Sequence, residues 1–392
     1  MTNLDAFKSE TRAWLEENCP LEMRVPMGSD DDACWGGRDW IFQSEDQKKW
    51  LEVMANKGWT APAWPREYGG GGLNKGEAKT LIKEMRRIGA RPPLVSFGIW
   101  MLGPALLKFG SEAQKKDYLP KITRGEIRWC QGYSEPGAGS DLANIQTKAI
   151  DKGDHFLVSG QKIWTSYADH ADWIFCLVRS EPDASKHTGI SFILFDMAST
   201  GVSTKPIKLI SGSSPFCETF FENVFVPKAQ LVGERGKGWT IAKYLLTHER
   251  EMIGELGLSE GQESVSEMAI EAYGTKNNVL NDPMFRSELA RHEVNVAAFD
   301  LTMERVKAET KAGQGTGATS AMLKYFGTEL NKERMELIMQ IEGVNALEWE
   351  GENADEGQVA KQWLRSRGNS IEGGTTEVQL NIIAKHILSL PS

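Results

Sequence analysis

Three segments of the 392-residue sequence combine glycines, hydroxyls and aromatic side chains in ways that suit ligand binding. The first covers residues 129–141, where Pro136 and the glycines Gly137 and Gly139 allow the backbone to approach a ligand closely. Its backbone N–H groups and the hydroxyl of Ser140 can converge as donors on an anion or a heteroaromatic ring. From composition alone, an ordinary tight turn explains the segment equally well.

The second and third segments each have a structural alternative. Residues 160–166 place Trp164 beside two hydroxyls, so a flat face for stacking lies next to a donor for a ring nitrogen. Strand tryptophans more often serve the core. Residues 370–379 join paired glycines to paired threonines ahead of an apolar helix that we expect over residues 382–390. There the alternative is a helix start with a capping hydroxyl.

Motifs of several other enzyme classes fail in this sequence. The nearest approach to a zinc-binding HExxH begins at His292, but Val296 occupies the second ligand position, and the six histidines have no metal-like spacing. Residues 137–139 begin like a dinucleotide fingerprint, but Leu142 stands where its third glycine belongs. The Walker A motif does not occur, and the one GxSxG string, at 257–261, falls in the last, helical third of the sequence instead of after a predicted strand, so it does not indicate a serine elbow. We therefore expect no metal site.

Composition restricts the partners and the compartment. The 54 acidic and 45 basic side chains give a net charge of −9, which disfavours nucleic acid and anionic membranes as partners. The five cysteines are scattered without a CxxC pair, and residues 1–18 carry charges throughout. These features predict a cytoplasmic protein in a reducing compartment.

The elements follow the order α, then β, then α. Helical spacing holds over residues 4–124, where Gly103-Pro104 is expected to break an apolar stretch at 94–109 and residues 61–72 are expected to form a surface loop. It returns after Gly238, where Asp282 and Pro283 form a helix start signal. Between them lie short runs of β-branched and aromatic residues, at 155–158, 172–178, 190–195, 202–209 and 218–226. We predict an α+β fold with an N-terminal α-helical domain (1–126), a middle antiparallel β domain (127–235) and a C-terminal four-helix bundle (236–392). This order argues against a Rossmann domain.

Taken together, these features resemble the acyl-CoA dehydrogenase family over essentially the whole chain. The resemblance rests on SEPGAGSD at 134–141, GQKIWTS at 160–166, FENVFVP at 221–227 and GGTTEVQLNIIA at 373–384. It implies non-covalent FAD between the β domain and the C-terminal helices.

The same resemblance implies positions for the cofactor contacts. Trp164 is expected to stack on the isoalloxazine ring, and Ser166 to hydrogen-bond near its N5 atom. Gln340 and Gly343 would hold the FAD of a neighbouring subunit. The remaining cofactor contacts are expected at Gln131, Tyr133, Ser134, Gly139, Ser140, Thr165, Gly374, Thr375 and Glu377.

The catalytic base departs from the pattern of many family members, because Gly373 occupies the position of their C-terminal-loop glutamate. One branch of the family places its glutamate on a helix of the last domain, and the matching residue here is Glu249, followed by Arg250. We expect Glu249 to be the base. Glu372 is the rival, and a chain without a base is the third possibility. The backbone N–H of Gly373 is expected to help hold the thioester oxygen.

The implied reaction is α,β-dehydrogenation of an acyl-CoA to a trans-2-enoyl-CoA, with electrons passed to an electron-transferring flavoprotein. Alternatives are a non-catalytic subunit of a heteromeric dehydrogenase and an oxygen-using flavin oxidase. The resemblance also implies a homodimer or homotetramer, with a heteromer possible. The substrate contacts are expected at Ser96, Phe97, Trp100, Ser140 and Arg250, which do not determine the acyl chain.

Two segments differ from the family pattern. Residues 276–283 replace an R-x-x-F-G segment whose arginine reaches the partner's FAD, which leaves Lys276 as a candidate charge. By this resemblance, residues 29–40 form a longer segment than the simplest members carry. They could shape the substrate entrance, but we expect inert surface.

Overall fold

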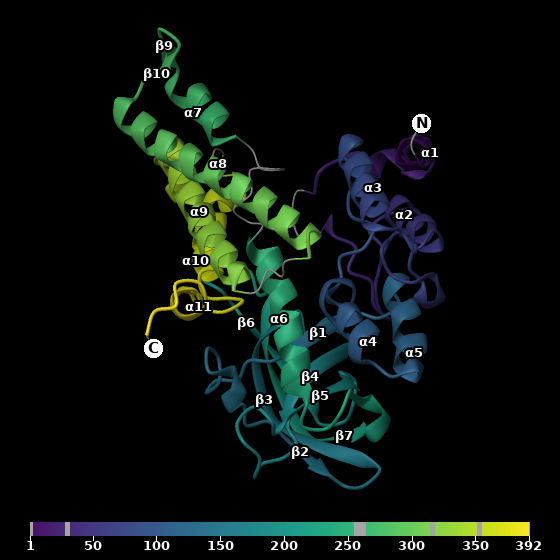
Figure 1. Ribbon diagram of the computed structural model, residues 1–392. Coiled ribbons are helices and arrows are strands. Elements are labelled where there is room, and N and C mark those ends of the chain that lie inside the picture. The colour runs from purple at the N-terminus through teal and green to yellow at the C-terminus, as the bar shows by residue number, and fades with distance from the viewer. Residues whose placement is uncertain (1–2, 28–31, 255–263, 314–317, 351–354, 392) are drawn as a thin grey trace. The chain divides into compact units, whose positions relative to one another are not determined.

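The computed structural model describes residues 3–27, 32–254, 264–313, 318–350 and 355–391, and the side chains of 247–254, 311 and 355 lie outside this description. The chain forms two compact units (Figure 1). The first comprises Met1–Ile207 and Pro215–Leu245, and the second Lys208–Ser214 and Leu246–Ser392.

The first unit begins with capped helices. The side chains of Ser44, Asn74 and Ser111 each accept a backbone N–H at a helix start, which supplies partners that the first turn lacks. Trp50 and Met54 are buried against Leu15. The elements are α1 (Asn3–Asn18), η1 (Leu21–Arg24), α2 (Glu45–Asn56), η3 (Arg66–Tyr68), α3 (Lys75–Arg87), η4 (Gly98–Leu102), α4 (Gly103–Phe109) and α5 (Glu112–Thr123).

Two glycine-containing segments in this part differ from the sequence expectation. Gly103 and Pro104 do not break the apolar stretch; they mark where the π-helical turn η4 passes into α4. A Cβ on Gly103 would lie 2.0 Å from the ring of Trp64, so the glycine permits a close approach. The loop 61–72, expected at the surface, packs inward instead, with Trp64 and Tyr68 buried.

An eight-stranded sheet follows in the same unit. Its main path runs β6-β7-β3-β2-β4-β5-β8, and β1 pairs with β4. The pairings are antiparallel except that β1 and β2 each run parallel to β4, which corrects the purely antiparallel expectation. The strands are β1 (Trp129–Gly132), β2 (Lys148–Asp151), β3 (His155–Ser166), β4 (Trp173–Arg179), β5 (Ile190–Asp196), β6 (Val202–Ile207), β7 (Phe216–Pro227) and β8 (Leu231–Val232), with the short helices η5 (Leu142–Asn144) and η6 (Lys228–Gln230).

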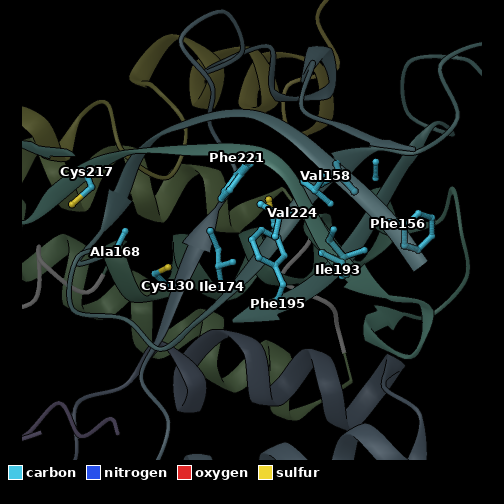
Figure 2. Packing of buried hydrophobic residues seen from close by; sticks show 14 residues of the cluster. Cys130, Phe156, Val158, Ala168, Ile174, Ile193, Phe195, Cys217, Phe221 and Val224 are labelled. Atoms are coloured by element: carbon cyan, nitrogen blue, oxygen red, sulfur yellow. The ribbon is translucent and has the colours of Figure 1, made fainter. Parts of the chain in front are cut away.

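Strand β3 is much longer than the expected run of 155–158, because two irregularities carry it onward. The pairing of β3 with β7 shifts register between Val158 and Gly160, and again between Lys162 and Thr165. A Cβ on Gly160 would lie 2.6 Å from Thr147, so only glycine fits there. The buried apolar side chains of the sheet, among them Phe156 and Phe221, form its core (Figure 2).

The second unit is helical. Helix α9 (Thr319–Glu342) packs against α7 (Val265–Tyr273), α8 (Pro283–Lys311), α10 (Gln358–Asn369) and α11 (Thr376–His386). A two-stranded hairpin, β9 (Thr275–Lys276) and β10 (Val279–Leu280), precedes α8, and η8 (Asn345–Leu347) and η9 (Asp355–Gly357) precede α10. Helix α6 (Gly238–Gly254) spans the boundary between the units.

The helix starts of this unit test two expectations. Asp282 caps α8, accepting the N–H of Phe285 at 2.8 Å, and Pro283 is its first residue, as predicted. The last helix was expected over 382–390 but runs from Thr376 to His386, because Thr375 caps it by accepting the N–H of Val378. Of the helices that the structure describes, none has the length and apolar character needed to span a membrane.

Candidate functional site

A buried ion pair fixes the loop of residues 133–141. Lys162 Nζ lies 2.8 Å from Glu135 Oε1 and donates to the carbonyl of Tyr133 at 3.0 Å. The Glu135 carboxylate also accepts the N–H groups of Gln146 (2.5 Å) and Thr147 (2.9 Å). Burial alone would raise the pKa of Glu135, but these partners outweigh it and lower that pKa below its usual value. The buried pair of Lys162 and Glu135 therefore holds the first residues of this loop in place.

The anchored loop lies beside the end of β3, where the N–H of Ile163 donates to the carbonyl of Ser134 at 2.9 Å. The next residue, Trp164, has a φ of 60°, a strained conformation for a bulky side chain. Its side chain is 53% exposed and meets Phe216 edge to face with centroids 6.0 Å apart. The strand irregularity thus presents a flat indole at the surface.

Two expected cofactor contacts have buried side chains. Tyr133 packs edge to face against Phe175 and Phe192, and Thr165 has no exposed surface. The side chains of these two residues therefore belong to the packed interior and offer no surface to a bound molecule. Ser134 and Ser166 are half-buried, whereas Ser140 is exposed.

The residues around this loop fit a flavin. Gly137 and Gly139 are exposed, and a Cβ on either would meet no atom within 4 Å, so space is open beside the backbone. The half-buried Gln131 has an amide nitrogen, Nε2, with no hydrogen-bond partner in the described chain. With the exposed indole of Trp164, these features supply a stacking face, a free donor and open space.

An aromatic cluster lies in the same unit. Trp35 contacts Phe97 with centroids 5.9 Å apart and Tyr167 with centroids 4.8 Å apart. The guanidinium of Arg128 lies over both the Trp35 ring (4.7 Å) and the Tyr167 ring (5.2 Å). The described part of the segment 29–40 therefore packs, through Trp35, against Phe97, one of the expected substrate residues.

The other expected substrate residues of this unit differ in exposure. Ser96 is buried, and its hydroxyl accepts the N–H of Gly98 at 3.1 Å, so it supports the η4 turn. Trp100 is 39% exposed and meets Phe97 edge to face. Phe97 and Trp100 therefore retain the surface that a ligand needs, and Ser96 does not.

In the second unit, Gly373 and Gly374 form a turn with φ values of 64° and 96°, which favours glycine at both positions. Gln379 Nε2 donates to both of their carbonyls, at 3.0 and 3.1 Å, and the buried Lys324 Nζ donates to that of Gly374 at 2.9 Å. Within the described residues, the N–H of Gly373 donates to no acceptor. The turn therefore holds one free backbone donor in a fixed place.

Glu372, the rival base, is held by two neighbours. Arg365 Nη2 lies 2.7 Å from one of its oxygens, and Asn369 Nδ2 donates to the other at 2.6 Å. Both oxygens of the carboxylate are thus engaged.

The remaining expected residues of this unit lie on two features. Thr375 and Glu377 line a pocket of about 340 Å³ together with Glu329 and Lys332. The helix-start N–H and the Thr375 hydroxyl lower the pKa of Glu377. Gln340 lies near the end of α9, where its side chain donates to Glu288 at 3.0 Å, and Gly343 follows with a φ of 56°.

Glu249 and Arg250 lie on helix α6, but their side chains are outside the described residues.

Sequence reasoning missed Lys162, Trp35, Arg128 and Lys324. Lys162 stands within the quoted motif at 160–166, and a charged side chain in a run of strand residues that ends with Ile163 and Trp164 was the available signal. The others become visible only when distant segments meet in the fold.

Three family models match successive parts of the chain. They are described as the N-terminal, middle and C-terminal domains of acyl-CoA dehydrogenase, and they match residues 37–126, 130–224 and 236–388. The chain belongs to the acyl-CoA dehydrogenase family. It is an oxidoreductase with that family's three-domain fold and acts in acyl-CoA dehydrogenation. FAD is its expected cofactor.

Similar acyl-CoA dehydrogenases cover nearly the whole chain. Acyl-CoA dehydrogenase IpdE1 of Mycolicibacterium smegmatis is 32% identical, covering 100% of this chain and 99% of that protein. The solved "Tcur3481-Tcur3483 steroid ACAD" is 32% identical with a TM-score of 0.79, covering 100% of this chain and 98% of the other. The ChsE4-ChsE5 complex from Mycobacterium tuberculosis is 27% identical with a TM-score of 0.74, covering 100% and 98%.

Proposed function

We propose that this acyl-CoA dehydrogenase converts an acyl-CoA to a trans-2-enoyl-CoA with Glu249 as its base. The observation that carries the base assignment is that the C-terminal turn argues against a base at either alternative position, 373 or 372. Position 373 is a glycine in a conformation that favours glycine, and the carboxylate of Glu372 is engaged by Arg365 and Asn369. Among the candidates from the sequence, Glu249 is the one left to remove the α proton.

Each unit by itself contains residues proposed to contact FAD. In the first unit, Trp164 offers its exposed face, Gln131 offers a free amide donor, and Ser134, Gly139, Ser140 and Ser166 surround them on the loop and strand end. Tyr133 and Thr165, also expected at the cofactor, are buried and are proposed to support this strand end from within. In the second, Gly374, Thr375 and Glu377 supply a turn and a helix start. When bound, FAD supplies the acceptor for the β hydrogen, which leaves the substrate as hydride.

Gly373 is proposed to act through its backbone. Removal of the α proton places negative charge on the thioester oxygen, and a preorganised N–H donor stabilises such charge without reorganisation. The N–H of Gly373 is unoccupied within the described residues, and its turn is held by Gln379 and Lys324. Glycine at 373 therefore retains the oxyanion contact while it lacks a base.

Substrate contacts are proposed at Phe97, Trp100, Ser140 and Arg250, with Ser96 supporting the η4 turn. We infer an electron-transferring flavoprotein as the acceptor and an oligomer in which Gln340 and Gly343 meet the neighbouring subunit's FAD. A heteromer is the second candidate, because two similar solved proteins, Tcur3481-Tcur3483 and ChsE4-ChsE5, are each named as a pair.

The test is an anaerobic acyl-CoA panel with the purified, FAD-loaded protein, followed at the flavin absorbance band. We expect at least one acyl-CoA to bleach the flavin and yield a trans-2-enoyl-CoA, with reoxidation by electron-transferring flavoprotein. Absence of bleaching across the panel contradicts an active dehydrogenase and favours a non-catalytic subunit. Stoichiometric peroxide in air identifies an oxidase instead.

A further inference from the structure

Arg128 carries a buried charge that the cofactor site does not use. It immediately precedes β1 and is only 7% exposed. Its guanidinium is enclosed by the faces of Trp35 and Tyr167, at 4.7 and 5.2 Å from their centroids. Such cation–π contacts hold a planar guanidinium in place while they leave the N–H groups at its edge available.

The carboxylates near Arg128 are committed to other partners. One oxygen of Asp172 accepts the backbone N–H groups of Arg128 and Arg38, at 2.8 and 2.9 Å, and the other lies 3.4 Å from the Arg38 guanidinium. Asp169 lies 3.8 Å from His170. Within the residues that the structure describes, the Arg128 guanidinium itself has no hydrogen-bond acceptor and no carboxylate within ion-pair distance.

This situation is energetically costly. A buried charge needs a partner, and burial lowers the pKa of Arg128 despite the neighbouring acidic groups. An anion that reached its N–H edge would replace the lost hydration with charge-assisted hydrogen bonds. The Arg128 nitrogens are not among the fully buried atoms that lack a partner, so the edge of the guanidinium remains open to such an anion.

The position of Arg128 indicates which part of a ligand would meet it. Tyr167 directly follows Ser166 of the proposed flavin site, and Trp35 contacts Phe97 of the proposed acyl pocket. The rings of Trp35 and Phe97 form an apolar wall that suits methylene or ring carbons.

We propose that Arg128 is a specificity-determining residue that binds a carboxylate at the far end of the acyl group. This inference rests on the proposed function, because it assumes that an acyl-CoA is the substrate. A carboxylate matches the planar fork of a guanidinium bidentately, whereas a terminal methyl group leaves the buried charge unpaired.

The test compares pairs of acyl-CoAs of equal carbon number, one ending in a methyl group and one in a carboxylate, at short, medium and long chain lengths. Equilibrium binding is measured by calorimetry and flavin reduction by anaerobic absorbance, in the FAD-loaded protein. The variants are Arg128→Gln and Arg128→Met, the second retaining an apolar stem between the rings. Arg38→Gln is the matched control, because Arg38 lies nearby and is paired with Asp196.

We expect the wild type to bind the carboxylate member of at least one pair about tenfold or more tightly than the methyl member. Both Arg128 variants should abolish this ratio, and Arg38→Gln should preserve it. The inference is overturned by a wild type without preference at any length, or by a folded Arg128 variant that keeps the ratio or weakens both members equally. A carboxylate preference in binding without any flavin reduction counts against the proposed function alone, whereas reduction by methyl-ended acyl-CoAs without preference counts against Arg128 alone.

Discussion

Lys162 and Glu135 form an ion pair of 2.8 Å in which both side chains are almost fully buried. The pair joins the middle of β3 to the root of the loop at 133–141 and holds that loop beside Trp164. Since buried charges are stable only when paired, each residue makes the other necessary.

Lys162→Met should therefore lower the free energy of unfolding by about 3–5 kcal/mol, because it leaves the Glu135 carboxylate buried without its cation. Denaturant unfolding of the purified protein measures this. Lys205→Met is the control, because the Lys205 side chain is 74% exposed and its ion pair with Glu218 is a long one, at 3.7 Å. This substitution should change the free energy of unfolding by less than about 1 kcal/mol. Adding Glu135→Leu to Lys162→Met should recover part of the loss. A single variant as stable as the wild type contradicts the role given to the pair.

Stability at acidic pH should depend on Glu84. Its buried carboxylate is hydrogen-bonded by Arg12 (3.0 Å) and Arg87 (2.6 Å), and these partners lower its pKa from 4.5 to about 2. A lowered folded-state pKa contributes stability above the unfolded pKa, and this contribution is lost as pH falls through the folded pKa. Glu84→Gln should cost about 2 kcal/mol at neutral pH, and the difference should shrink between pH 4.5 and about 2.

Unfolding free energies of wild type and Glu84→Gln across this pH range test the prediction. Glu52→Gln, at an exposed position on α2, should match the wild type throughout. A difference that grows as the pH falls has the wrong sign for this mechanism.

Trp164 should contribute to cofactor retention rather than to stability. Trp164→Leu removes an aromatic face of which 53% is exposed, so FAD affinity should fall roughly threefold to tenfold with little change in unfolding free energy. Flavin-to-protein absorbance after dialysis and titration of the apoprotein with FAD measure this. Trp100→Leu should retain FAD and alter acyl-CoA binding instead. Equal FAD affinity in Trp164→Leu and the wild type counts against the stacking assignment.

The turn before α11 should not tolerate a side chain at Gly374. Its φ is 96°, and an added Cβ would lie 2.5 Å from Gln379 Nε2, the atom that holds the turn. Gly374→Ala should cost about 1–3 kcal/mol and weaken FAD binding. Gly76→Ala, at an exposed position in α3 without a positive φ and with no atom closer than 3.3 Å to the added Cβ, should be neutral or slightly stabilising. Thermal unfolding of the two variants separates strain in the Gly374 backbone from the effect of an added methyl group. Equal melting temperatures for the two variants contradict the prediction.

Local signals in the sequence predicted the elements that local chemistry determines. Asp282 and Pro283 start a helix because their side chains act on adjacent backbone. The predicted start of the last helix was several residues late, because the apolar run marks only part of the helix and the capping hydroxyl of Thr375 determines where α11 begins. The length of β3 was missed because pairing with β7 carries it through Gly160.

The site was predictable only in part. The motif resemblance located Trp164 and the glycine turn, but not what holds them. Glu135 and Lys162 are 27 residues apart, and the environment of Arg128 combines Trp35 with Tyr167. Such contacts depend on tertiary packing, which periodicity and propensity do not encode.

The most direct test of the central claim is the rate of anaerobic flavin reduction by a reactive acyl-CoA in Glu249→Gln. Glutamine nearly preserves the size of the side chain and removes its ability to accept the α proton. Glu372→Gln serves as the matched control, and FAD content and melting temperature are verified for both. We predict that Glu249→Gln lowers the rate constant by about a hundredfold or more, whereas Glu372→Gln changes it only severalfold. Flavin reduction at the wild-type rate in Glu249→Gln, or its loss in a folded, FAD-loaded Glu372→Gln, would contradict the account.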